Sequence, residues 1–156
     1  MFCFQMFDLE IINAKKREDL CFTIVEWFHK NYLKYHEIEI IVEHNDLKED
    51  KVYGYCDISP YEEDGENPRS FLIELEKTLE TDDYISTLLH ELHHVFQFRQ
   101  GWLKIKNAKR YWNNSIVDDL DYDNQPHEIE AEQQGLLLYE SFMTFFSKLD
   151  KDSKTL

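Results

Sequence analysis

The sequence predicts an α+β fold, in which a mixed sheet of three or slightly more strands packs with an N-terminal, a central and a C-terminal helix. Three segments repeat apolar residues at three- and four-residue steps, the spacing of an amphipathic helix. Three shorter segments are rich in Ile, Val, Tyr or Phe, as strands are. With 156 residues, 42% of them hydrophobic, the chain can bury a core without disulfides, so we expect one domain over residues 1–156.

The first helix is predicted over residues 16–35, where apolar side chains occur at positions 20, 24, 25, 28 and 33. Strands are predicted over residues 37–42, 51–58 and 70–76. The first and third of these alternate apolar with acidic residues, which is typical of half-buried strands. The apolar segment 2–12 fits either a strand or the lead into a helix, and its periodicity does not decide between them.

The central helix is predicted over residues 82–100, because Gly101 can end it at a position where a positive φ costs little. Residues 102–125 then form a connection so long that we expect it to be functional or partly structured. The last helix is predicted over residues 126–148. Pro126 opens it, since proline suits the first helical turn.

The central helix carries the run His90-Glu91-Leu92-His93-His94, which has the pattern HExxH. Because positions i and i+4 lie one above the other on a helix, His90 and His94 can present two imidazole nitrogens to one metal ion. Glu91 is offset around the helix, where it can act on a water molecule as a general base. His93 points off this face, and we expect it to have a structural or surface role.

A catalytic zinc ion needs a third protein ligand as well as an open position. The last helix supplies candidates. Glu128 and Glu132 are one turn apart on one face, so Glu128 can bind the metal while Glu132 accepts the outer N–H of a ligand histidine. Glu130 is expected to point away from that face. Glu132, Glu130 and His127 remain alternatives for the third ligand, and an acidic first helical turn without any metal would also explain these residues.

The motif, followed by Glu128-Ile129-Glu130-Ala131-Glu132, resembles the gluzincin metallopeptidases, in which a glutamate on a second helix completes a His, His, Glu zinc site. This second stretch is similar to the E-x-x-[SA]-[DN] pattern of thermolysin-like and ImmA-like metallopeptidases. It also resembles short metallopeptidase-like proteins of phages and bacteria. The chain has Glu132 where those families have Asp or Asn. The resemblance covers residues 85–135 and implies Zn²⁺ held by the two motif histidines and Glu128.

The resemblance also implies the activity, a zinc-dependent hydrolysis of peptide bonds in a peptide or protein substrate. Zinc would lower the pKa of a coordinated water from about 15.7 towards 7, and Glu91 would carry its proton to the leaving amine. In such folds the strand before the motif helix, here residues 70–76, is the edge strand that pairs with an extended substrate. A further donor should stabilise the oxyanion. The residues that qualify, which the sequence does not rank, are Tyr111, Tyr122, Arg110 and His127.

Composition excludes several partner classes. With 32 acidic and 17 basic residues the formal net charge is −15, which disfavours nucleic acid and anionic membranes as partners. Cys3, Cys21 and Cys56 are odd in number and widely separated, as expected in a reducing compartment. We interpret them as small buried hydrophobic residues, with zinc ligation as an alternative. The N-terminus has no basic flank and no apolar run approaches about 20 residues, so we expect a cytoplasmic protein.

Two other functions fit the same residues. The site could hold zinc structurally in a catalytically silent metal-binding module, since the 33 residues between His94 and Glu128 could close over the ion. The presence of Glu91, which a purely structural site does not need, argues against this alternative. Without a metal, the chain would be an acidic protein-interaction module that occupies basic surfaces of its partners. The sequence gives no indication of the oligomeric state.

Overall fold

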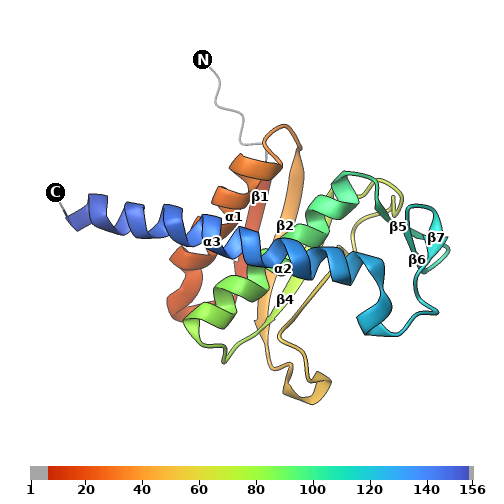
Figure 1. Ribbon diagram of the computed structural model, residues 1–156, viewed down its shortest axis with the longest axis horizontal. Coiled ribbons are helices and arrows are strands. Elements are labelled where there is room, and N and C mark those ends of the chain that lie inside the picture. The colour runs from red at the N-terminus through yellow and green to blue at the C-terminus, as the bar shows by residue number, and fades with distance from the viewer. Residues whose placement is uncertain (1–6, 155–156) are drawn as a thin grey trace.

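The computed structural model describes residues 7–154, and its main sheet has four strands in the order β1–β2–β4–β3 (Figure 1). Strands β1, β2 and β4 are parallel to one another, whereas β3 is antiparallel to β4. The strand bounds are Phe7–Ile12 for β1, Ile38–Asn45 for β2, Gly54–Ile58 for β3 and Ser70–Glu76 for β4. The predicted α+β class and mixed sheet are confirmed, and the ambiguous segment is a strand from Phe7 onward. Its residues 2–6 lie outside the described part of the chain.

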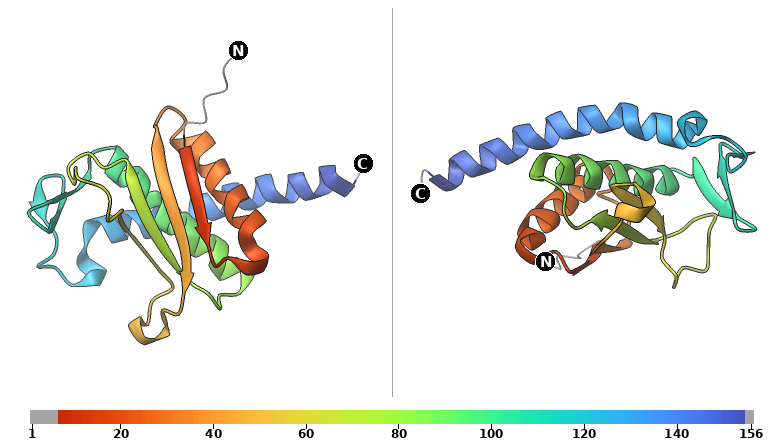
Figure 2. Two further views of the ribbon diagram at one scale, coloured as in Figure 1. Left: turned by 180° about the vertical axis from the view of Figure 1, so that it is seen from behind. Right: turned by 90° about the horizontal axis from the view of Figure 1, so that it is seen from below.

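Three helices accompany this sheet within the described residues: α1 (Glu18–Tyr32), α2 (Thr81–Arg99) and α3 (Pro126–Lys154). Figure 2 shows that α1 and α2 lie together against one face of the sheet and that α3 crosses over them as an outer layer. The C-terminal part of α3 extends past the rest of the molecule (Figure 1). Because α2 lies between the sheet and α3, one of its sides packs on the core and the other faces α3.

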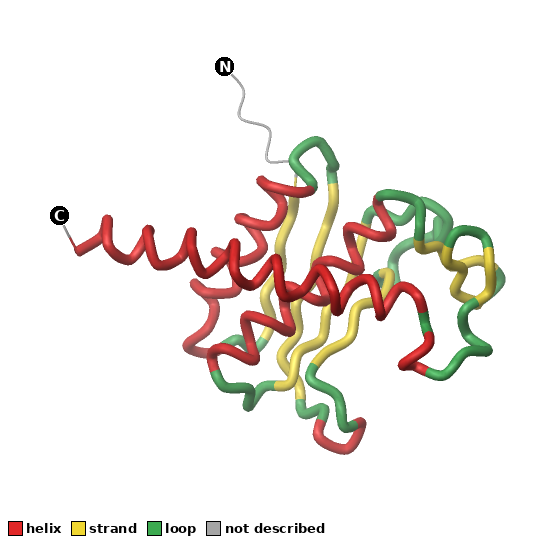
Figure 3. The backbone as a smooth tube through the Cα atoms, viewed as in Figure 1, coloured by secondary structure: helices red, strands yellow, loops and turns green. Residues whose placement is uncertain are grey.

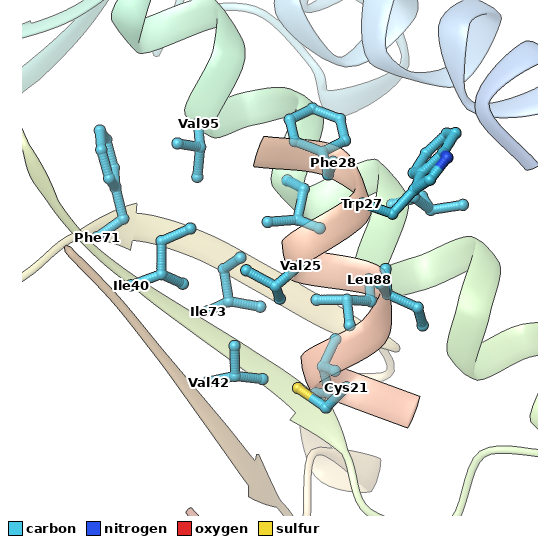
Figure 4. Close-up of a cluster of buried hydrophobic side chains, with 14 of the residues drawn as sticks. Cys21, Val25, Trp27, Phe28, Ile40, Val42, Phe71, Ile73, Leu88 and Val95 are labelled. Atoms are coloured by element: carbon cyan, nitrogen blue, oxygen red, sulfur yellow. The ribbon is translucent and has the colours of Figure 1, made fainter. Parts of the chain in front are cut away.

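The core fills the space between the sheet and the two inner helices (Figure 4). Val25 and Phe28 of α1 meet Ile40 and Ile73 of the sheet, and Leu88 comes from α2; all five are at most 1% exposed. Burying each such side chain stabilises the fold by about 1.5–3 kcal/mol. This packing fixes the rotation of α2 about its axis, and it therefore directs the polar residues of α2 away from the sheet.

The edge of the sheet differs from the expectation. Residues 70–76 were expected to form the edge strand, but β4 pairs with β2 on one side and with β3 on the other, so the two edge strands are β1 and β3. The physical reason is burial. Phe71, Ile73 and Leu75 of β4 are fully buried, which requires an interior strand, whereas no residue of β3 is fully buried.

The long connection between α2 and α3 is structured. It forms a three-stranded antiparallel sheet of β5 (Leu103–Lys106), β6 (Lys109–Trp112) and β7 (Ser115–Ile116), visible in Figure 3 beside the helices. Its two hairpin turns place a pair of residues each at positive φ, as tight turns between twisted strands require. The pairs are Asn107 with Ala108, and Asn113 with Asn114. Within residues 7–154, none of the helices combines the length and the apolar character needed to cross a membrane.

Candidate metal centre

The polar side of α2 meets the first turn of α3, and this contact brings the expected metal ligands together. Ala131, Leu138 and Phe142 of α3 are buried and hold this helix in place. Pro126 begins α3, as predicted, so that Glu128 lies in its first turn and faces α2. Two helices that are far apart in sequence therefore supply the site from rigid backbone positions.

His90, His94 and Glu128 place one ligand atom each within 4.8 Å of one another. His90 Nε2 lies 3.1 Å from Glu128 Oε2, and His94 Nε2 lies 3.1 Å from Glu128 Oε1. Ligands of a tetrahedral zinc ion at 2.0–2.1 Å are about 3.4 Å apart, and each of the two imidazole–carboxylate distances is close to that value. Burial opposes ionisation of Glu128, but its hydrogen bonds with the two imidazoles lower its pKa well below the usual range. The carboxylate is therefore in the form that binds a metal.

Gln97 fixes the orientation of His94. The Gln97 side-chain amide donates from Nε2 to the carbonyl oxygen of His127 at 2.8 Å and to Glu130 Oε1 at 3.3 Å. Its Oε1 consequently faces His94 and accepts the Nδ1–H at 2.8 Å. Because this contact keeps a proton on Nδ1, His94 can release the Nε2 proton that it donates to Glu128 and then offer the Nε2 lone pair to a metal ion.

Of the two other glutamates near the start of α3, Glu132 differs from the expectation and Glu130 does not. Glu132 is exposed, and no hydrogen bond within residues 7–154 joins it to a histidine. The hydrogen bond to a ligand histidine that was expected from Glu132 is made by Gln97 instead. Glu130 is outside the ligand cluster, as its helical position predicts, and it accepts hydrogen bonds from His93 Nε2 at 2.7 and 2.9 Å. His93 is buried and stacks on Phe96, with ring centroids 5.3 Å apart. These contacts give His93 a structural position between the two helices.

Glu91 lies on the wall of a cleft of about 700 Å³ that also contains the three ligand residues. It is only 6% exposed. Burial raises the pKa of its carboxyl group, and the nearby imidazoles of His94 and His90 partly oppose this rise. A carboxylate with a raised pKa is a stronger proton acceptor, so the environment of Glu91 suits a general base.

Three of the four candidate oxyanion donors line the same cleft, namely Tyr122, Arg110 and His127, whereas Tyr111 does not. The Tyr122 hydroxyl donates to Glu128 Oε2 at 2.8 Å. His127 is 4% exposed, its Nδ1 has no hydrogen-bond partner among the described residues, and burial lowers its pKa to about 4. The Nη2 atom of the Arg110 guanidinium group lies 3.7 Å from Asp57 Oδ1. Of the four candidates, these three are therefore the ones that border the cleft.

The edge strand β3 also lines the cleft, through Gly54, Tyr55 and Cys56. Cys56 is half-buried, and burial raises the pKa of its thiol well above the usual value, so the sulfur stays protonated. It is not part of the ligand cluster. Cys21 is buried in the core, as interpreted from the sequence, and Cys3 lies outside the described residues.

Sequence reasoning missed the role of Gln97 and, although it predicted the strand β3, it missed the position of that strand at the edge of the sheet. A signal for Gln97 was present, since it lies three residues after His94 on the same helical side within an otherwise apolar stripe. The position of β3 had no comparable signal, because strand order depends on pairing between distant segments.

No protein-family model matches the chain, and comparisons with curated proteins and with solved structures find no significant match. The resemblance to gluzincins therefore rests on the residues of α2 and α3.

Proposed function

We propose that the protein is a zinc-dependent metallopeptidase-like hydrolase that cleaves peptide bonds. The observation that carries the proposal is the convergence of His90, His94 and Glu128 beside Glu91 in one cleft. The two imidazoles and the carboxylate would hold Zn²⁺, a donor set that leaves a position open for catalysis. When bound there, zinc supplies Lewis acidity, which polarises a carbonyl group and makes water more acidic.

The chain's own groups suit the remaining tasks. Glu91 accepts a proton from the attacking water and transfers it to the leaving amine. Tyr122, Arg110 and His127 line the cleft and are the candidates to donate a hydrogen bond to the developing oxyanion, an interaction worth about 3 kcal/mol in known cases. The free edge of β3 borders the cleft, so its backbone N–H and C=O groups can pair with an extended peptide. A peptide or protein is accordingly the proposed substrate.

The test begins with the zinc content of the protein after it has been rinsed with a chelator and supplied again with zinc. We expect one zinc ion per chain in the parent and its loss in His90→Ala and Glu128→Ala. If the parent binds no zinc, the proposal is wrong. If only Glu128→Ala retains zinc, the third ligand lies elsewhere on the chain.

Glu91→Gln then separates catalysis from binding, because it removes a base without removing a ligand. We expect this variant to retain zinc and to lose cleavage of a quenched-fluorescent peptide library by about 10²- to 10⁴-fold. Full activity in Glu91→Gln would refute the assigned mechanism. Zinc bound by a parent that cleaves no member of the library would favour the catalytically silent metal-binding module instead.

A further inference from the structure

A second cavity, of about 390 Å³, lies where the three parallel strands end. Its lining comes from residues 13–17 after β1, from His44 near the end of β2, and from residues 77–80 after β4, together with Tyr84 of α2. It shares no lining residue with the cleft of the metal centre. The carboxyl ends of parallel strands are where open α/β sheets bind their ligands, because the chain turns outward there and leaves a crevice.

The charge of this cavity is opposite to that of the whole molecule. Lys15, Lys16, Arg17 and Lys77 line it, and Glu80 is the one acidic residue of the lining. No ion pair within the described part of the chain involves any of these four basic side chains. In a protein of net charge −15, four unpaired cations at one crevice indicate a site for an anion.

The backbone at residues 13–15 adds donors to these charges. Asn13 has φ 59° and Lys15 has φ 55°, while Ala14 between them is right-handed with φ −73° and ψ −20°. Alternation of left- and right-handed residues turns successive N–H groups toward one concave side, which forms an anion-binding nest. The N–H groups of Ala14 and Lys15 donate to no acceptor within residues 7–154. A left-handed lysine costs about 1–2 kcal/mol, and strain of this kind is concentrated at functional sites.

Three lining residues of the cavity, Arg17, His44 and Tyr84, are held by contacts with one another and with the end of β1. The Arg17 guanidinium carbon lies 4.8 Å from the centre of the Tyr84 ring, a cation–π contact between two residues of the lining. The Tyr84 hydroxyl donates to His44 Nε2 at 2.8 Å, and His44 Nδ1 donates to the carbonyl oxygen of Ile12 at 2.8 Å. This chain of hydrogen bonds fixes the end of β1, and with it the start of the nest. The site is therefore organised before a ligand arrives.

We propose that this cavity binds the phosphate group of a small anionic molecule, cradled by the N–H groups of Ala14 and Lys15 and neutralised by Lys15, Lys16, Arg17 and Lys77. The volume is within the range of small-molecule pockets, about 300–1,000 Å³. Nucleic acids and anionic membranes do not fit, since they would also meet the acidic remainder of the surface. The site is independent of the proposed metal centre and of its chemistry.

The test uses inorganic pyrophosphate and metal-free protein, so that the anion has no zinc to bind. We expect saturable binding by calorimetry at low salt, with amide chemical-shift changes concentrated at residues 13–17 and 77–80. The variant Lys16→Gln/Lys77→Gln removes two cations whose side chains are exposed, and it should weaken binding about tenfold or more, or 1.4 kcal/mol per factor of ten. Inorganic phosphate should produce shifts at the same amides with lower affinity.

The matched control is Lys106→Gln/Lys109→Gln, which removes the same charge from two exposed lysines of the small sheet. We expect this control to bind pyrophosphate as the parent does. An equal loss of affinity in the two double variants would show that binding depends only on the overall charge of the protein, and it would overturn the proposal. Absence of saturable binding, or shifts confined to residues around His90 and Glu128, would overturn it as well.

Discussion

At the scale of single residues, the chemistry of His94 depends on the orientation of one buried amide. Gln97 is held by the carbonyl oxygen of His127 and by Glu130, and its own oxygen then determines which nitrogen of His94 carries the proton. The HExxH spacing was readable from the sequence because it depends only on helix geometry. The role of Gln97 was not, because its partners lie about 30 residues further along the chain and become neighbours only when α3 packs on α2.

This arrangement predicts the effect of Gln97→Met, which keeps the side-chain volume and removes the hydrogen-bond acceptor. Loss of such an outer contact to a ligand histidine typically weakens metal binding about 10- to 100-fold, and we expect that loss in zinc affinity here. Competition with a chromophoric chelator measures it, and thermal unfolding checks that the fold persists. Glu132→Ala is the control and should leave the zinc affinity unchanged. If Glu132→Ala weakened zinc binding and Gln97→Met did not, the residue that orients the ligand histidine would be Glu132.

At the scale of elements, the close contact between β3 and α2 defines one side of the metal-site cleft. Gly54 makes this contact possible, because a Cβ atom there would lie 2.9 Å from Thr87 Cγ2 and 3.0 Å from the carbonyl oxygen of Glu74. The existence of most elements followed from periodicity, and β4 has the predicted bounds of Ser70–Glu76. The order of the strands in the sheet could not be predicted from this periodicity, because it is decided by which strands bury both of their faces. The short hairpins of β5–β7 were also missed, since their apolar runs are too brief to show a period.

The contact at Gly54 leads to a stability prediction for two glycine substitutions. Gly54→Ala overpacks the β3–α2 contact, which costs about 1–3 kcal/mol, less a gain of about 0.5 kcal/mol from the stiffer unfolded chain. We therefore expect net destabilisation in urea unfolding. Gly135→Ala is the matched control, because Gly135 lies within α3 and no atom is found within 4 Å of its added Cβ. It should stabilise the protein by about 0.5–1 kcal/mol. Equal responses at both sites would show that β3 and α2 do not meet closely.

At the scale of the whole molecule, the net charge was readable from composition, whereas its distribution was not. Lys15, Lys16 and Arg17 meet Lys77 only because β1, β2 and β4 are parallel and end on one side of the sheet. In the same way, the candidate metal ligands meet only when α3 packs across α2 as the outermost layer. A ligand set divided between two helices exists in the folded protein and not in the unfolded chain.

Zinc should therefore stabilise the whole fold. At a free zinc concentration about 100 times the dissociation constant, binding to the native state alone adds about 2.7 kcal/mol to the free energy of unfolding. For a chain of this length, that corresponds to a rise in Tm of about 5–10 °C. Scanning calorimetry with and without zinc measures the rise. Glu91→Gln should retain it because its ligands are intact, whereas Glu128→Ala should lose it because α3 then contributes no ligand. A rise of the same size in Glu128→Ala would mean that zinc binds within α2 alone or elsewhere, and that α2 and α3 are not joined through the metal.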